Sequence, residues 1–414
     1  MVKKVQTSLA EILDTVRGSS DLVCDIQKKL TAFRAVGPEN AGPGEAAKAR
    51  YVEDFLRAKG VSDILHVDAE DTRVEGGLRP NLVATIPGKS EQALWLFAHM
   101  DVVPEGEASL WKTNPWEVVQ KGDLLYGRGV EDNQQALTSM LVLAHALNKG
   151  NVTPNLTLKL VFISDEECGN TMGMAHLLEE RPDLFKKDDL YIIPDSGSPD
   201  GSLIEIAEKG VFRMKFTVTG SQCHASTPGK GVNSLQAMAN VVMAMDKLYG
   251  FFPEENPLFE PSTCTFTPTM HEKNVSATNI LPGQDIFWMD CRALPGVDPQ
   301  KVHARATDLA ESAAAFMGAT VRVELDSLTE ASETPKDAKV VQALSHALGE
   351  EGIEPRLIGI GGSTVACLLR KMGLCACAWS TILNTCHEPN EHSSISATLR
   401  DAAVFARIVL GENA

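Results

Sequence analysis

Short apolar runs that alternate with helical segments most constrain how this chain can fold. The runs of strand length are 81–86, 93–98, 156–164 and 190–194. Residues with helical spacing of apolar side chains separate them, and the clearest such helix starts at Asp132 and stops at Gly150. This alternation predicts an α/β fold in which helices cover a mainly parallel sheet. In such folds the functional site lies at the carboxyl ends of the strands.

The sequence pattern changes near Gly210. The strands and helices expected after it are 211–219, 233–249, 263–270, 284–292, 299–317 and 320–326. Their order, βαββαβ, is that of a ferredoxin-like sandwich. Strand–helix alternation then resumes up to the C-terminus. We therefore predict a larger α/β domain formed by residues 1–209 and 327–414, with a smaller domain, 210–326, inserted in it.

Charge and cysteine usage narrow the class of protein. The 414 residues include 55 acidic and 38 basic side chains, which gives a net charge of −17. An acidic surface repels phosphate backbones and anionic lipids, so we expect neither a nucleic-acid nor a membrane partner. No apolar stretch is long enough to span a bilayer, and no signal-peptide core is evident. The nine cysteines form no C-x-x-C pair, so we expect reduced thiols and a cytoplasmic protein.

Five segments rich in acids and histidine follow the predicted strands or begin a helix. They contain His99 and Asp101, then Asp132, then Glu166 and Glu167, then Asp195, and finally His387 and His392. Each alone has an ordinary interpretation, such as a helix N-cap at Asp132 or a solvated acidic loop. As ligands they can supply two imidazoles, from His99 and one of the two late histidines, and three carboxylates, from Asp132, Glu167 and Asp195, at one sheet edge. Such a set can hold two divalent cations and leave one glutamate free as a base.

With its motifs in this order, the chain resembles the M20 family of metallopeptidases and deacylases. That family includes succinyl-diaminopimelate desuccinylase, acetylornithine deacetylase, carboxypeptidase G and dipeptidases. The resemblance covers nearly the whole chain, including the inserted domain. It implies that His99 and Asp195 hold one metal ion and that Glu167 and a late histidine hold another. Asp132 would bridge the two ions.

The resemblance also implies the roles of the neighbouring residues. The family pattern His-x-Pro-x-Glu fits His387-Glu388-Pro389-Asn390-Glu391, so His387 is the expected ligand and His392 falls in a variable position. Asp101 would orient His99, because ligating imidazoles need their other ring nitrogen held. Glu166 would be the general base that activates the water between the metals.

The inserted domain carries further residues that match the family. By the resemblance, His224 would polarise the scissile carbonyl and stabilise the oxyanion. Asn279 and Arg292 match positions that bind polar groups of the substrate, and an arginine fork suits a free carboxylate. Gly362 and Ser363 open a predicted helix, where backbone amides could also hold a carboxylate.

The expected function is metal-dependent hydrolysis of an amide bond in an N-acyl amino acid or a short peptide with a free carboxylate. Zinc is the expected metal, with cobalt or manganese as alternatives. The inserted domain would act as a lid and would also form a homodimer, in which His224 serves the partner's active site. A dipeptidase or carboxypeptidase on the same scaffold is the first alternative, and a catalytically silent binding protein is the second.

Overall fold

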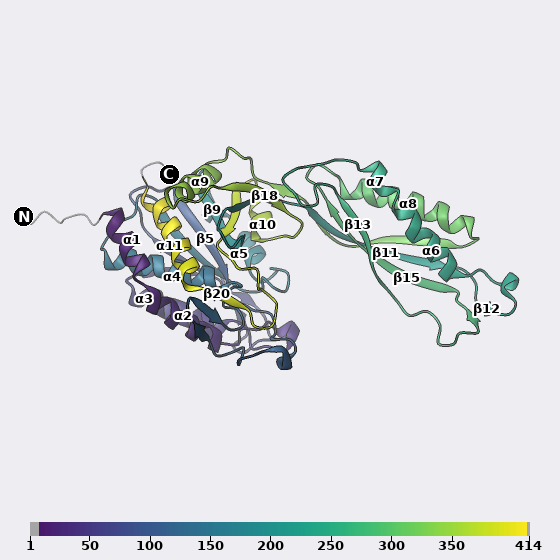
Figure 1. The fold of residues 1–414 in the computed structure, drawn as a ribbon, viewed down its shortest axis with the longest axis horizontal. Helices are drawn as coiled ribbons and strands as arrows, with labels where there is room; N and C mark the ends of the chain where they lie inside the picture. Colours follow the sequence, from purple (N-terminus) through teal and green to yellow (C-terminus); the bar gives the residue numbers. More distant parts are fainter. Residues whose placement is uncertain (1–7, 412–414) are drawn as a thin grey trace, which may run out of the picture. The chain divides into compact units, whose positions relative to one another are not determined.

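The computed structural model describes residues 8–411, which divide into two compact units. The first unit comprises Met1–Ile206, Thr334–Leu357 and Thr364–Ala414, and the second comprises Ala207–Glu333 and Ile358–Ser363. The segment expected to form the inserted domain, 210–326, falls inside the second unit. Both units are drawn in Figure 1.

A mixed sheet forms the centre of the first unit. Its main strands are β1 (Asp63–His66), β4 (Leu82–Ile86), β5 (Ala93–His99), β8 (Thr157–Ile163), β9 (Leu190–Gly197), β10 (Leu203–Glu208) and β19 (Ala376–Ser380). They lie in the order β1-β4-β8-β5-β9-β19-β10. The four neighbours β8, β5, β9 and β19 are parallel, whereas β1, β4 and β10 pair antiparallel. The predicted mainly parallel sheet is thus confirmed at its centre, with antiparallel strands added on both sides.

Shorter strands complete this part of the structure. They are β2 (Ala69–Glu70), β3 (Leu78–Arg79), β6 (Val119–Lys121), β7 (Leu124–Tyr126) and β20 (His392–Ser394). Strands β17 (Ser332–Glu333), which belongs to the second unit, and β18 (Arg356–Ile360), which is divided between the units, both pair with β10. Strand β20 pairs with β7. This pairing brings the segment with the two late histidines, His387 and His392, next to the loop that precedes Asp132.

Helices cover both faces of the sheet. They are α1 (Leu9–Arg17), α2 (Ser20–Ala32), α3 (Ala46–Ala58), α4 (Gln134–Lys149), α5 (Met174–Glu180), α9 (Lys339–Glu350), α10 (Val365–Lys371) and α11 (Ile395–Leu410). Helix α4 is buried on almost every side and packs against α2, α11 and β5 (Figure 1). On the opposite face, Leu177 of α5 and Leu369 of α10 join a core cluster with Trp95 and Phe97 of β5. Because both faces of β5 are buried, its sequence is an almost continuous run of apolar residues.

The second unit is a four-stranded antiparallel sheet with helices on one face (Figure 1). Its elements are β11 (Gly210–Thr219), β12 (Cys223–His224), α6 (Ser234–Met245), α7 (Leu248–Phe251), β13 (Thr265–His271), β14 (Ile280–Leu281), β15 (Gln284–Ala293), α8 (Pro299–Phe316) and β16 (Thr320–Thr329). The main strands lie in the order β13-β15-β11-β16, which is the ferredoxin-like arrangement that the sequence predicts. Alternate side chains of β11, including Phe212, Met214 and Phe216, are buried beneath α6 and α8.

The described residues, 8–411, also bear on membrane spans and on the state of the cysteines. None of the helices in that range is long and apolar enough to cross a membrane. All nine cysteines are free thiols, as expected from their spacing.

Candidate metal centre

The predicted ligands of the first unit meet at the carboxyl edge of the parallel strands. His99 is the last residue of β5 and lies opposite Ile163, the last residue of β8. Glu167 follows β8 by four residues, and Asp195 lies near the end of β9. Because parallel strands end at the same edge, side chains from distant parts of the chain converge there.

Asp132 lies between two imidazoles. Its Oδ1 is 2.8 Å from Nε2 of His99, and its Oδ2 is 3.0 Å from Nε2 of His387. Nε2 of His387 is also 3.1 Å from both carboxylate oxygens of Glu167. Nε2 of His99 is 4.0 Å from Oδ1 of Asp195. One carboxylate therefore faces two groups of potential ligands, which is the arrangement that a bridging ligand requires.

Buried acids crowd this cluster. Burial and the nearby charge of Asp132 raise the pKa of Asp195 to about 7. Burial raises the pKa of Glu166 well above its usual value. Burial lowers the pKa of His99, but its bonds to Asp101 and Asp132 outweigh this effect and raise that pKa. Such shifts indicate a local negative potential that bound cations would relieve.

The donor set suits two divalent ions. Groups of ligand atoms within 4.8 Å of one another include His99, Asp132 and Glu167, and also His99, Glu166 and Asp195. Mixed imidazole and carboxylate ligation is typical of zinc and of related divalent metals. The residues present therefore fit the two-metal site that the sequence predicts.

Asp101 ties the first imidazole to the acidic loop. It is 1% exposed, and its Oδ1 is 3.4 Å from Nδ1 of His99. Its two oxygens accept hydrogen bonds from the backbone N–H groups of Glu166 and Glu167, at 3.1 and 3.0 Å. One buried carboxylate thus contacts His99, a candidate ligand, and fixes the backbone of the predicted base and of Glu167, a second candidate ligand.

Glu391 organises the loop before Asp132, a role that the sequence pattern does not reveal. Its buried carboxylate accepts hydrogen bonds from the backbone N–H groups of Gly129, Glu131 and Asp132, at 2.8 to 3.0 Å. It also accepts one from Nη1 of Arg128, at 2.7 Å. The glutamate of the His-x-Pro-x-Glu segment therefore holds the loop that carries Asp132, the residue expected to bridge the metals.

Glu131 makes the reciprocal connection. Its carboxylate accepts hydrogen bonds from the backbone N–H groups of Leu383 and Thr385 and from the Thr385 hydroxyl. His392, the alternative to His387, lies against an aromatic side chain: its ring stacks on Tyr126 with the ring centroids 4.9 Å apart. Its Nδ1 is 3.0 Å from the carbonyl oxygen of Asn390. Of the two histidines, His387 is therefore the one that lies among the acids.

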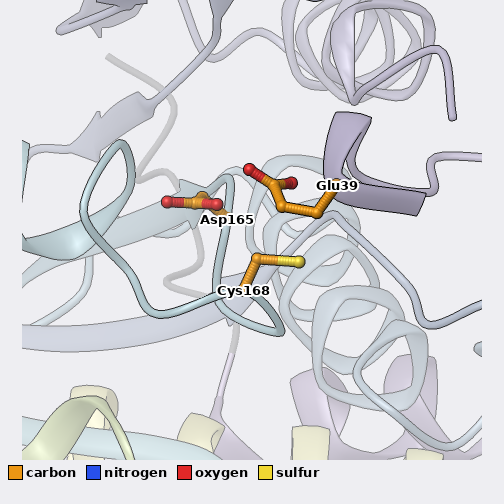
Figure 2. Close-up of side chains that lie close together, drawn as sticks. All are labelled: Glu39, Asp165 and Cys168. Atoms are coloured by element: carbon orange, nitrogen blue, oxygen red, sulfur yellow. The ribbon is translucent and has the colours of Figure 1, made fainter. Parts of the chain in front are cut away.

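A second group of potential ligand atoms lies close by, and Figure 2 shows it. Glu39, Asp165 and Cys168 offer atoms within 4.8 Å of one another. Arginines already neutralise both acids, because Arg73 pairs with Glu39 at 2.7 Å and Arg79 lies 3.5 Å from Asp165. Burial raises the pKa of the Cys168 thiol to about 12, which disfavours the thiolate that metals bind. We assign no metal to this group.

Arg79 also forms a buried ion pair with Glu45, close to the acidic loop that contains Asp165. Its guanidinium donates two hydrogen bonds to Glu45, at 2.8 and 2.5 Å, and both side chains are 0% exposed. Removing one partner of such a buried pair costs about 3–5 kcal/mol, because the other charge stays buried. This pair, which the sequence pattern also misses, fixes α3 to the strand at Leu78–Arg79.

The remaining predicted residues belong to the second unit. The β12–β14 ribbon pairs His224 with Ile280, and the N–H of Ala225 donates to the carbonyl of Asn279 at 2.9 Å. His224 and Asn279 are therefore close neighbours, and both side chains are exposed. Nδ1 of His224 accepts the backbone N–H of Ser226 at 3.1 Å. A neutral imidazole with that acceptor carries its proton on Nε2.

Arg292 lies next to the predicted glycine turn. Its Nη1 donates to the carbonyl oxygen of Gly361 at 2.8 Å. Its other nitrogens form a bidentate pair with Asp290, at 2.7 and 3.0 Å. Gly362 and Ser363 are exposed, and an added Cβ at Gly362 would meet nothing within 4 Å. The turn is open to solvent, whereas the arginine already has an acidic partner.

Comparison of sequences gives the family. The sequence model of peptidase family M20/M25/M40 matches residues 95–411. An uncharacterized metallohydrolase of Methanococcus maripaludis is 33% identical, over 97% of this chain and 100% of that protein. A succinyl-diaminopimelate desuccinylase of Nautilia profundicola is 26% identical, over 94% of this chain and 98% of that protein.

Solved structures agree on the fold. The aminopeptidase PepT of Bacillus cereus has a TM-score of 0.74 at 19% identity, over 94% of this chain and 98% of its own. A dinuclear metal-binding peptidase of the M20 family from Bacillus subtilis has a TM-score of 0.66 at 14% identity, over 95% of this chain and 98% of its own. These matches confirm the resemblance inferred from the motifs: the chain belongs to peptidase family M20/M25/M40 and is a metallohydrolase of the M20 type.

Proposed function

We propose that this protein uses two divalent metal ions to hydrolyse an amide bond in an N-acyl amino acid or a short peptide with a free carboxylate. The observation that carries the proposal is the position of Asp132 between His99 and His387, with further carboxylates around both imidazoles. The dinuclear peptidase of Bacillus subtilis, which shares the fold, supports the choice of two ions.

The ligand assignment follows the two groups around Asp132. His99 and Asp195 would hold one ion, Glu167 and His387 the other, with Asp132 shared between them. Zinc is our first choice because the donors are nitrogen and oxygen, and cobalt or manganese could replace it. When bound, the ions would lower the pKa of a water molecule and polarise the amide carbonyl.

Glu166 is the proposed general base. It lies among the proposed ligands, and within residues 8–411 its carboxylate makes one long hydrogen bond, 3.4 Å from Nδ2 of Asn170. It therefore has lone pairs available to accept a proton from the attacking water and to pass one to the leaving amine. Asp101 holds the backbone N–H of Glu166 and thereby fixes where the base can reach.

Residues of the second unit would bind and polarise the substrate. With Nδ1 occupied by Ser226, His224 presents Nε2–H, which suits donation to a developing oxyanion. Asn279, adjacent to His224, would bind a polar group of the substrate. The exposed turn at Gly362 and Ser363, next to Arg292, would bind the free carboxylate.

We also propose a cytoplasmic homodimer formed through the second unit, in which His224 serves the active site of the partner. Nine free thiols fit a reducing compartment. Exposed apolar side chains on the second unit, including Met243 at 67% and Phe316 at 84% exposed, provide surface that a partner could cover.

The two late histidines provide a matched test of the ligand set. Replacing His387→Ala removes a proposed ligand, so we expect the metal content to fall from two ions per chain to about one. His392→Ala removes a ring that stacks on Tyr126 and should leave two ions bound. Metal analysis after dialysis against zinc measures both. Equal metal content in the two variants would refute the choice of His387.

A zinc-supplemented panel of N-acyl amino acids, dipeptides and tripeptides tests the reaction class. We expect hydrolysis of at least one member that has a free carboxylate. Glu166→Gln should lower kcat by about 10²–10⁴-fold, because it removes the acid–base group. Glu179→Gln, the same change at an exposed position of α5, serves as the control and should leave kcat unchanged. Retention of activity in Glu166→Gln would exclude it as the base.

Mixing two inactive variants tests the proposed dimer. His224→Ala protein lacks the donor and Glu166→Gln protein lacks the base, so a mixed dimer should contain one intact site. We expect part of the activity to return when the subunits exchange, as followed by native mass spectrometry. Exchange without recovered activity would contradict the role of His224 in the partner's site.

A further inference from the structure

Asn133, the residue after Asp132, has a buried side-chain amide that contacts a proposed metal ligand. The residue is 2% exposed. Its Nδ2 donates a hydrogen bond to Oδ1 of Asp195, at 2.6 Å, and another to the carbonyl oxygen of Pro194, at 3.0 Å. Both partners are acceptors, so the nitrogen of the amide, and not its oxygen, must face them. The side chain therefore acts as a donor.

Helix capping does not explain an asparagine at this position. An asparagine that directly precedes a helix usually accepts a hydrogen bond from the first turn through its side chain. Asn133 precedes α4, but its side chain makes no capping hydrogen bond. Its amide instead connects the start of α4 to β9, the strand that carries Asp195.

The two hydrogen bonds together restrict the side chain of Asp195. Within residues 8–411, the bond from Asn133 is the one hydrogen bond that the Asp195 carboxylate makes. Nε2 of His99 is 4.0 Å from the same oxygen, which is beyond hydrogen-bond distance. The bond to Pro194 fixes the amide against the backbone of the residue that precedes Asp195. The amide is thus held in place and limits how the carboxylate can rotate.

Gln135 makes the same kind of contacts to a carboxylate that is not a proposed ligand. It is 0% exposed, and its Nε2 is 2.5 Å from the carbonyl oxygen of Thr381 and 3.2 Å from Oδ2 of Asp401. Like Asn133, it has a side-chain carbonyl oxygen without a hydrogen-bond partner among the described residues. The two amides therefore differ chiefly in the carboxylate that each one holds.

We propose that Asn133 is a positioning residue of the metal centre. Its amide holds Asp195 in the orientation in which this carboxylate can bind the same ion as His99. Asn133 acts through Asp195 and not by contact with the metal or the substrate. The inference rests on the proposed function, because it requires Asp195 to be a metal ligand.

The experiment compares Asn133→Leu with the matched control Gln135→Leu. Each change replaces a buried amide by an apolar side chain and removes hydrogen bonds to one backbone carbonyl and one carboxylate. Titration of the metal-free proteins with Co²⁺, followed by visible absorption and by calorimetry, gives the affinity of each ion and requires no substrate. Thermal unfolding of the metal-free proteins measures the loss of stability, which we expect in both variants.

We expect Asn133→Leu to bind one ion as tightly as wild type and the other about 10–100-fold more weakly, as when other residues that orient metal ligands are removed. Gln135→Leu should bind both ions as wild type does. In His387→Ala protein, the ion between His99 and Asp195 is the one expected to remain. Adding Asn133→Leu to that variant should weaken the remaining ion by the same factor, which identifies the affected site.

Two results would overturn the inference. If Asn133→Leu binds both ions like wild type, the amide does not position Asp195. If both ions weaken equally, or if Gln135→Leu weakens them to the same extent, the effect is a general loss of structure. Should Asn133→Leu not fold, Asn133→Ala and Gln135→Ala are compared by the same criteria, and failure of Asn133→Ala to fold as well would assign Asn133 a structural role.

Failure of the proposed function is visible in the wild-type protein itself. Wild type would then bind fewer than two ions or would hydrolyse no amide, before any variant is compared. The inference about Asn133, in contrast, depends on the difference in metal affinity between Asn133→Leu and Gln135→Leu. Wild type that binds two ions but hydrolyses no amide would refute the proposed reaction, and that difference would still decide the inference.

Discussion

The concentration of buried negative charge at one sheet edge is the constraint on which the rest of the first unit depends. Asp101, Glu131 and Glu391 are at most 3% exposed. Asp132 and Asp195 add two further carboxylates, 2.8 and 4.0 Å from Nε2 of His99. Carboxylates cannot be buried together without cations or several hydrogen bonds. Arginines and backbone N–H groups pair with the supporting acids, such as Glu391, and we propose that metal ions neutralise the acids next to His99 and His387.

This constraint explains the geometry of the loops. Glu391 accepts hydrogen bonds from three backbone N–H groups of the loop before α4. Glu131, in that loop, accepts a hydrogen bond from the backbone N–H of Thr385, in the loop before His387. Each of these two carboxylates therefore gains hydrogen bonds and also fixes a loop that carries a proposed ligand, Asp132 or His387. The left-handed backbone of His387, with φ of 62°, is uncommon for a residue with a Cβ and is held by these loops.

The sequence predicts the fold, and it also predicts that the candidate ligand residues lie close together, because both depend on local patterns. Strand ends are readable from apolar runs, and parallel strands bring their carboxyl ends to one edge, so His99 and Asp195 could be placed together in advance. The antiparallel strand β10 was missed because Leu203–Glu208 has no clear alternation. The supporting acids were missed for a different reason: Glu391 bonds to a loop 262 residues away, and no local pattern records such a pairing.

Anomalous X-ray diffraction from zinc-loaded crystals at the zinc absorption edge would locate the bound ions directly. We predict two anomalous peaks, one near His99 and Asp195 and one near Glu167 and His387, with Asp132 between them. No peak at this edge of the sheet, or a peak at Glu39, Asp165 and Cys168 instead, would contradict it.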